Sequence, residues 1–179
     1  MTTAFLVIDV QNALCKGQWA AFDVEGVVER INGVAAKARG VGAPVVFIQH
    51  EEEHEAMRFD SAGWQLHEGL DVQPQDRRVR KTTCDAFFKT ELRQLLADQG
   101  ISRLIVSGMQ SEFCVDSTVR SALAHGFPVV LVSDGHTTLD NGVLRAAQIT
   151  AHHNITLSHI GGYGPSVTVV PASEIRVES

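Results

Sequence analysis

Short apolar runs alternate along this chain with longer stretches of helical periodicity, and this alternation limits the possible folds most strongly. Residues 4–8 read AFLVI, a run without a polar position. From 24 to 39 the apolar residues recur at helical spacing instead, behind Asp23 as a candidate N-cap. Strands that alternate with helices indicate βαβ units and a parallel sheet, whose core strands are buried on both faces. The pattern therefore predicts an α/β protein.

The rest of the chain continues the pattern. We expect further strands at 45–48, 77–80, 103–106, 129–132 and 155–158, and helices at 87–100, about 114–125 and about 141–153. One more apolar run occupies 167–170. Residues 50–76 are polar and aperiodic, which predicts a long loop of the kind that is usually functional or mobile in a compact domain.

Length, charge and cysteine content exclude several classes of protein. A chain of 179 residues is expected to form one domain, 1–179, with a sizeable core. Fifteen Lys and Arg against 21 Asp and Glu argue against a nucleic-acid partner. The absence of a long apolar run or a basic leader argues against a membrane location or export. Three cysteines without a CxxC motif favour free thiols in a reducing cytoplasm.

Three reactive side chains fall where predicted strands end. Asp9 follows the first strand, Lys81 follows the third, and Cys114 follows the strand at 103–106 through a turn. Taken singly, such residues are more often a turn aspartate, a solvated lysine and a small buried cysteine. Ligands of open α/β sheets, however, bind beyond the carboxyl ends of the strands. Their joint placement at that edge predicts a functional site.

Cys114 is the most informative of the three because it is expected to open a helix. The N–H groups and macrodipole of a helix N-terminus stabilise a thiolate, and a nearby lysine would lower the pKa of the thiol further. We therefore expect Cys114 to alkylate quickly near neutral pH. Cys15 and Cys84 are expected to be buried, structural and slow to react. The turn before Cys114 is suited to aiming backbone N–H groups at an oxyanion.

The residues around these positions resemble the isochorismatase-like cysteine hydrolases, also called nicotinamidase-related amidohydrolases. The string DVQN at 9–12 resembles the family's D-x-Q-N, and VRK at 79–81 with DAF at 85–87 resembles its V-x-K…aF segment. GMQSEFCV at 108–115 is similar to the nucleophile turn, and the resemblance runs from about residue 3 to 157. It implies a three-layer αβα fold with a six-stranded parallel sheet in the order 3-2-1-4-5-6.

The resemblance also implies roles for individual residues. Cys114 becomes the nucleophile, Asp9 the general base and Lys81 its electrostatic partner, while the backbone N–H groups of Gln110 and Cys114 form an oxyanion hole. A non-proline cis peptide is implied in this turn, and we place it between Met109 and Gln110. The implied reaction is hydrolysis of a C–N bond in a small amide or ureido compound through a thioester. It needs no cofactor, and relatives commonly form homo-oligomers.

The segment after the second strand departs from the metal-binding nicotinamidases of the family. Gln49 stands where we align their Asp, and their D-W-H-P-x-H string is missing. His50, Glu53 and His54 are metal-ligand types, but a run of Glu and His is more often a solvated loop, so we predict no bound metal. Nicotinamidase, an isochorismatase-type ether hydrolase and a non-catalytic binding relative remain alternatives.

Two further sets of residues surround the predicted site. Gln11 and Asn12 are expected to fix the loop after Asp9 by hydrogen bonds. The candidate substrate-binding residues, whose aromatic members are equally suited to anchoring a loop, are His50, Phe59, Trp64, Met109 and Phe113.

Overall fold

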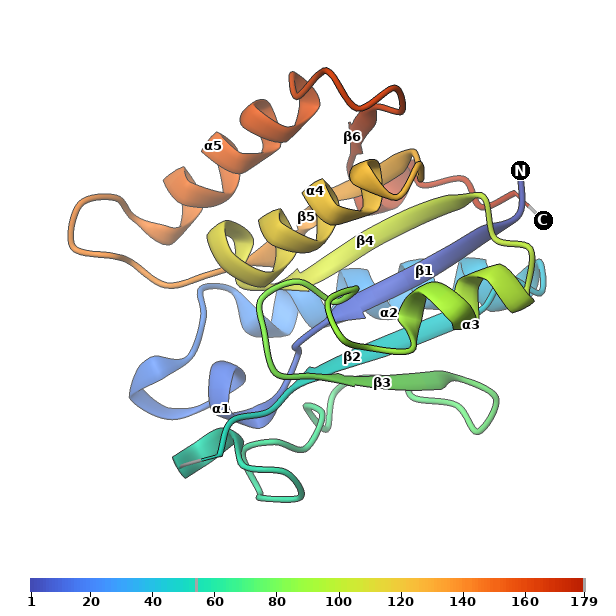
Figure 1. Ribbon diagram of the computed structural model, residues 1–179. Coiled ribbons are helices and arrows are strands. Elements are labelled where there is room, and N and C mark those ends of the chain that lie inside the picture. The colour runs from blue at the N-terminus through green and yellow to red at the C-terminus, as the bar shows by residue number, and fades with distance from the viewer. Residues whose placement is uncertain (54, 179) are drawn as a thin grey trace.

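Six parallel strands form one sheet in the order β3-β2-β1-β4-β5-β6 (Figure 1). The computed structural model describes residues 1–53 and 55–178. The strands are β1 (Thr3–Ile8), β2 (Val45–His50), β3 (Arg77–Lys81), β4 (Arg103–Met109), β5 (Val129–Thr137) and β6 (Val167–Val170). The α/β class and the strand order that the resemblance implied are both confirmed.

Helices cover the two faces of this sheet and complete three layers. They are α1 (Asn12–Cys15), α2 (Val24–Gly40), α3 (Leu92–Asp98), α4 (Asp116–Ala124) and α5 (Ala146–Ser158). Residues of α3, α4 and α5 pack on one face, and residues of α2 with the C-terminal turn Ala172–Glu174 pack on the other (Figure 1).

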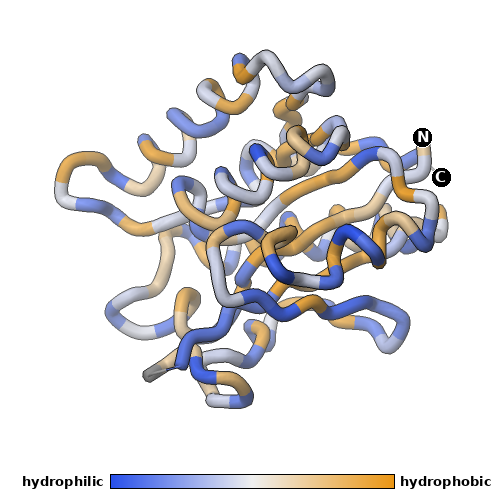
Figure 2. Tube along the Cα trace, in the orientation of Figure 1, coloured by the Kyte–Doolittle hydropathy of each residue, from blue (hydrophilic) through white to orange (hydrophobic). Residues whose placement is uncertain are grey.

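The first strand shows why the apolar runs are continuous. Ala4, Leu6 and Ile8 belong to the core under α3 and α4, whereas Phe5 and Val7 belong to the core under α2. All five side chains are fully buried, so neither face of β1 has room for a polar residue. Each large apolar side chain buried in this way contributes about 1.5–3 kcal/mol. Figure 2 shows the hydrophobic colour concentrated along the central strands.

The first long helix begins where predicted, but its N-cap residue acts differently. Asp23 precedes α2 with a left-handed φ of 51° and makes no side-chain capping bond. Its carboxylate pairs with Arg30 on the same helix instead. Packing of the apolar stripe of α2 against the sheet, rather than a capping bond, therefore holds this helix in place.

The helix predicted at 87–100 begins later, at Leu92. Phe87 lies in the preceding turn, where its N–H donates to the carboxylate of Asp85 at 2.8 Å. From this turn Phe87 still packs in the core, which is why its apolar character resembled helical periodicity.

The strand predicted at 155–158 is wrong, because these residues form the last turn of α5. Leu157 is fully buried, but Ile155 is 64% exposed, so the apolar pair does not mark a buried strand. The sixth strand is the later apolar run, Val167–Val170, which pairs with β5 at the edge of the sheet.

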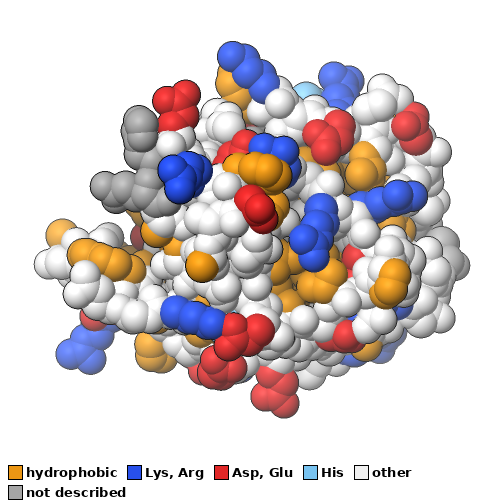
Figure 3. All heavy atoms as spheres, turned by 90° about the horizontal axis from the view of Figure 1, so that it is seen from below, with side chains coloured by type: hydrophobic (Ala, Val, Ile, Leu, Met, Phe, Trp, Pro, Cys, Tyr) orange, Lys and Arg blue, Asp and Glu red, His pale blue; other side chains and the backbone are white. Residues whose placement is uncertain are grey.

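The outer surface carries charges of both signs. Figure 3 shows Lys and Arg side chains interspersed with Asp and Glu on one face of the molecule. Among the described residues, no helix is both long enough and apolar enough to cross a bilayer.

Candidate active site

Asp9, Lys81 and Cys114 meet at the carboxyl edge of the sheet. The Lys81 Nζ atom lies 2.6 Å from Asp9 Oδ2 and 3.2 Å from Cys114 Sγ. It also donates to the carbonyl oxygen of Thr83 at 3.0 Å. The side chains of Asp9 and Lys81 are almost completely buried, where either charge alone would be strongly destabilising. One ammonium group therefore bridges a buried carboxylate and a thiol.

The strand ends bring these residues together across the chain. Asp9 follows β1 with a left-handed φ of 50°, an uncommon conformation for a residue other than glycine. Lys81 is the last residue of β3 and pairs in register with His50 of β2. Gly108 of β4 has a φ of 119°, and a Cβ atom there would lie 2.0 Å from the carbonyl oxygen of Ile8. Only glycine allows β4 to approach β1 so closely just before Cys114.

The turn after β4 carries the thiol into α4. The peptide bond between Met109 and Gln110 is cis, as the resemblance implied. Ser111–Val115 forms a π-helical turn, and α4 itself begins at Asp116. The carbonyl oxygen of Gln110 accepts hydrogen bonds from the N–H groups of Phe113 and Val115. Cys114 thus lies within the π-helical turn and does not open α4, which corrects the sequence prediction.

The electrostatics of the cluster also differ from the prediction. Burial raises the pKa of the Cys114 thiol, the Asp9 carboxylate raises it further, and Lys81 offsets only part of this effect. Burial by itself lowers the pKa of Lys81, but its interactions with Asp9 and Cys114 outweigh burial and raise that pKa overall. The prediction that the pKa of the thiol is lowered is therefore wrong. It did not include the burial of the thiol beside a carboxylate, which the sequence does not show. Burial and the carboxylate therefore favour the protonated form of the thiol beside the Lys81–Asp9 ion pair.

A cavity of about 180 Å³ opens onto this cluster. Its lining residues are Asp9, Leu14, His50, Glu52, Met57, Cys84, Gln110, Phe113 and Cys114. Of the candidate substrate-binding residues, His50 and Phe113 belong to this set. Four lining residues were not predicted, although each follows a recognised feature: Leu14 and Cys84 come soon after Asp9 and Lys81, and Glu52 and Met57 lie in the long loop.

The other three candidates do not line this cavity. Met109 is fully buried beneath the turn, with its sulfur 3.8 Å from Cys15 Sγ. Trp64 is buried and packs edge-on against Phe59, with ring centroids 4.9 Å apart. Phe59 borders a neighbouring hollow, and the Arg80 guanidinium lies 3.7 Å over its ring. The two aromatic residues therefore anchor the long loop against β3.

Hydrogen bonds from the segment after β1 hold the wall of the cavity. The Gln11 side chain donates to the carbonyl oxygen of His50 at 2.9 Å and accepts from the N–H of His50 at 2.8 Å. It also donates to the carbonyl oxygen of Trp64 at 2.8 Å, and Asn12 donates to that of Ala62 at 3.0 Å. Both residues therefore fix the loop, as predicted.

His50 itself lies between the ammonium and a second acidic group. Its Nδ1 atom is 3.3 Å from Lys81 Nζ, and its Nε2 atom is 3.4 Å from Glu52 Oε1. Gln11 holds the His50 backbone, and Lys81 and Glu52 flank its imidazole, which forms part of the cavity wall beside Lys81.

The two remaining cysteines have different environments. Cys15 is buried, and burial raises the pKa of its thiol to about 12. Cys84 is exposed at the cavity, which contradicts the prediction that it is buried. Cys15 is therefore still expected to react slowly, whereas Cys84 is accessible to an alkylating reagent.

Within residues 1–53 and 55–178, no three His, Cys, Asp or Glu side chains come together in a group that could hold a metal ion. Gln49, where we aligned an Asp of the metal-binding relatives, is fully buried and donates to the carbonyl oxygen of Trp64 at 3.0 Å. His54, one of the considered ligands, lies outside the described residues.

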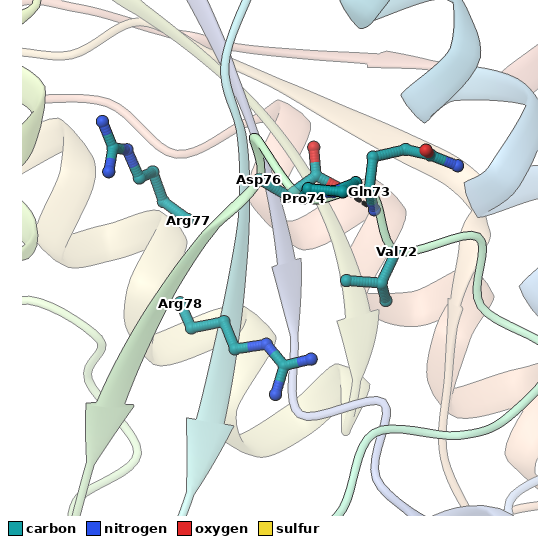
Figure 4. A pocket seen from close by; sticks show the side chains of 6 residues that line it. All are labelled: Val72, Gln73, Pro74, Asp76, Arg77 and Arg78. Carbon is teal, nitrogen blue, oxygen red and sulfur yellow. Dashed lines mark hydrogen bonds between the residues drawn. The ribbon is translucent and has the colours of Figure 1, made fainter.

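A larger hollow of about 540 Å³ lies at the opposite end of β3 (Figure 4). Arg77 and Arg78 point to opposite sides of the strand there, and Asp76 pairs with Arg39 at 2.7 Å. The hollow lies at the amino end of the strand, whereas Lys81 lies at the carboxyl end, so the two places are separate.

Comparison with known proteins places this geometry in a family. Residues 3–157 match the family model described as the isochorismatase domain. A streptothricin hydrolase of Streptomyces noursei is 41% identical over 138 residues, which cover 76% of this chain and 55% of that protein. This chain thus spans about half the length of the streptothricin hydrolases it matches.

Two further similar proteins are covered over more of their own length. A ureidoacrylate amidohydrolase of Caulobacter vibrioides is 29% identical over 184 residues, covering 82% of each chain. The crystal structure of an isochorismatase family protein superposes with a TM-score of 0.87 at 37% identity, covering 94% of this chain and 98% of that one. With the family model matched over residues 3–157, the chain belongs to the isochorismatase family.

Proposed function

We propose that this protein is a cysteine hydrolase that cleaves a C–N bond of a small amide or ureido substrate. The observation that carries the proposal is the Lys81 ammonium, 2.6 Å from Asp9 and 3.2 Å from Cys114, beside a cavity of about 180 Å³. A cavity of this size suits a small molecule. The names of two relatives, a streptothricin hydrolase and a ureidoacrylate amidohydrolase, support hydrolysis and a ureido substrate, respectively.

In the first step, Cys114 Sγ attacks the substrate carbonyl carbon while Asp9 accepts the thiol proton. The electron pair of the carbonyl bond moves to oxygen, and the N–H groups of Gln110 and Cys114 stabilise the resulting oxyanion. Because burial and Asp9 raise the pKa of the thiol, the proton leaves as the sulfur–carbon bond forms. Lys81 keeps the site close to neutral before and after this transfer.

In the second step, the C–N bond breaks and the proton on Asp9 passes to the leaving nitrogen, which departs as ammonia or an amine. The remaining thioester is then attacked by water, whose proton Asp9 accepts. Collapse of that intermediate breaks the sulfur–carbon bond and returns the proton to Cys114. The balance is one water consumed for one acid and one amine released.

The test is ammonia release from a panel of small amides. The panel contains nicotinamide, pyrazinamide, N-carbamoyl amino acids, ureidoacrylate and simple aliphatic amides. Cys114→Ala should abolish release of ammonia, whereas Cys84→Ala, which removes the exposed thiol of the same cavity, should preserve it. Acid quenching during turnover should trap the thioester, detected as an added acyl mass on the peptide that contains Cys114. Release of ammonia that survives Cys114→Ala would overturn the proposal.

A further inference from the structure

A second buried polar cluster lies behind the turn that carries Cys114. Ser111, the first residue of that turn, is fully buried, and its Oγ atom lies 2.8 Å from His136 Nδ1 on β5. The same Oγ atom lies 3.2 Å from Thr150 Oγ1 on α5. On the far side of the imidazole, His136 Nε2 lies 2.9 Å from Asn154 Oδ1. Strand, helix and turn are thus joined by side-chain hydrogen bonds.

The hydrogen-bond partners determine which atom is the donor in each contact of this cluster. Asn154 Nδ2 donates to the carbonyl oxygen of Ser133 at 2.9 Å, so Asn154 Oδ1 faces the imidazole as an acceptor. His136 Nε2 must therefore carry the proton, and Nδ1 accepts from the Ser111 hydroxyl. Thr150 donates in turn to Ser111. Burial lowers the pKa of His136 to about 4, which keeps the imidazole neutral for this arrangement.

Local backbone features place the histidine for this contact. Between the pairs Val106–Leu131 and Gly108–His136, β5 advances by five residues and β4 by only two. This irregularity sets His136 opposite Gly108, just before the turn. Thr150 and Asn154 are one helical turn apart on α5, so both reach the same buried pair.

We propose that His136 is a positioning residue which, through Ser111, holds the turn carrying Cys114 in register with Asp9 and Lys81. Ser111 lies in the chain between Gln110 and Cys114, whose N–H groups form the proposed oxyanion hole. A shift of Ser111 therefore moves the nucleophile and both donors together. This inference rests on the proposed role of Cys114 as the nucleophile.

The experiment compares two substitutions at one position. In His136→Asn, the amide oxygen can occupy the place of Nδ1 and still accept from Ser111, whereas His136→Leu removes that acceptor. Ser111→Ala removes the donor with little change in volume. Each full-length variant is treated with iodoacetamide, and mass spectrometry of its peptides gives separate alkylation rates for Cys114 and Cys84. Cys84 lies outside the cluster and serves as the internal control.

We expect His136→Leu and Ser111→Ala to change the ratio of the Cys114 rate to the Cys84 rate about tenfold, because a displaced Cys114 changes its burial and its distances to Asp9 and Lys81, which together set the pKa of its thiol. His136→Asn should restore that ratio to within about threefold of the unmodified protein, since it keeps the acceptor. With any substrate found in the amide panel, kcat should fall about tenfold while KM changes little.

Two results would overturn the proposal. One is a lower melting temperature in all three variants with an unchanged ratio of Cys114 to Cys84 alkylation, which would reduce the cluster to a structural role. The other is His136→Asn behaving like His136→Leu, which would exclude the Ser111 contact as the cause. The alkylation ratio needs no substrate, so it gives an answer even if Cys114→Ala refutes the proposed hydrolysis.

Discussion

Two buried polar clusters meet at the π-helical turn Ser111–Val115: Cys114 belongs to the first and Ser111 to the second. They differ in how fully their hydrogen bonds are satisfied. In the first, both carboxylate oxygens of Asp9 lack a well-aligned hydrogen bond, although one forms an ion pair with Lys81. In the second, Ser111 and His136 contact each other, Ser111 also contacts Thr150, and His136 also contacts Asn154, with the imidazole kept neutral by burial. A catalytic role is one reason for a buried polar group to lack hydrogen bonds, whereas a fully satisfied network makes the structure around it rigid.

The largest expected effect separates reaction from positioning. Cys114→Ala should lower hydrolysis by about 10³-fold or more, since it removes the proposed attacking atom. Ser111→Ala should lower it only about tenfold. Initial rates on a substrate from the amide panel provide the comparison, with thermal unfolding as a check on folding. Equal losses of activity in both variants would contradict the distinction between a reacting cluster and a positioning cluster.

The next largest effect concerns stability. Lys81→Met leaves the Asp9 carboxylate buried without its cation, which should destabilise the fold by about 3–5 kcal/mol. The double variant Asp9→Asn with Lys81→Met removes both charges and should recover much of that loss. Urea unfolding measures both. If Lys81→Met were as stable as the double variant, the unpaired Asp9 charge would not be the cause of the loss in stability.

The dependence of stability on acid should follow the second cluster. The pKa of His136 is about 4 in the folded protein and 6.5 without the fold, so the unfolded chain binds more protons between these values. The contribution of His136 to the unfolding free energy should therefore be fully present above about pH 6.5. It should be lost as the pH drops toward 4, and the loss is on the order of 3 kcal/mol.

In His136→Asn this contribution disappears, so the curve of unfolding free energy against pH should flatten in that window. Urea titrations at several pH values measure the slope. An unchanged slope in the variant would assign the acid sensitivity to other groups.

The smallest effect is expected at the rim of the second cluster. Thr150→Val keeps the side-chain shape and removes one hydroxyl, while Ser111 still donates to His136. The loss should be about 1 kcal/mol in unfolding free energy. The ratio of Cys114 to Cys84 alkylation should stay unchanged. A change in that ratio as large as in Ser111→Ala would show that the network acts as a whole, and that the Ser111–His136 contact is not decisive.

Local patterns account for what was predicted correctly. The apolar run of β1 and the stripe of α2 are set by neighbours in the chain, so periodicity was sufficient for them. The last strand was misplaced because the pair Ile155 and Leu157 resembles a strand, while only Leu157 reaches the core. A pattern of apolar residues does not show which of them are buried in the core.

The sequence by itself determined the α/β class, and its motifs at the strand ends were sufficient to indicate the family. The ends of parallel strands meet at one edge, which brought Asp9, Lys81 and Cys114 together as candidates before their distances were known. Tertiary structure alone decided the direction in which the pKa of the Cys114 thiol shifts, the exposure of Cys84 and the contact between Ser111 and His136. Burial and the distances between residues far apart in the chain control these properties, and local sequence encodes neither.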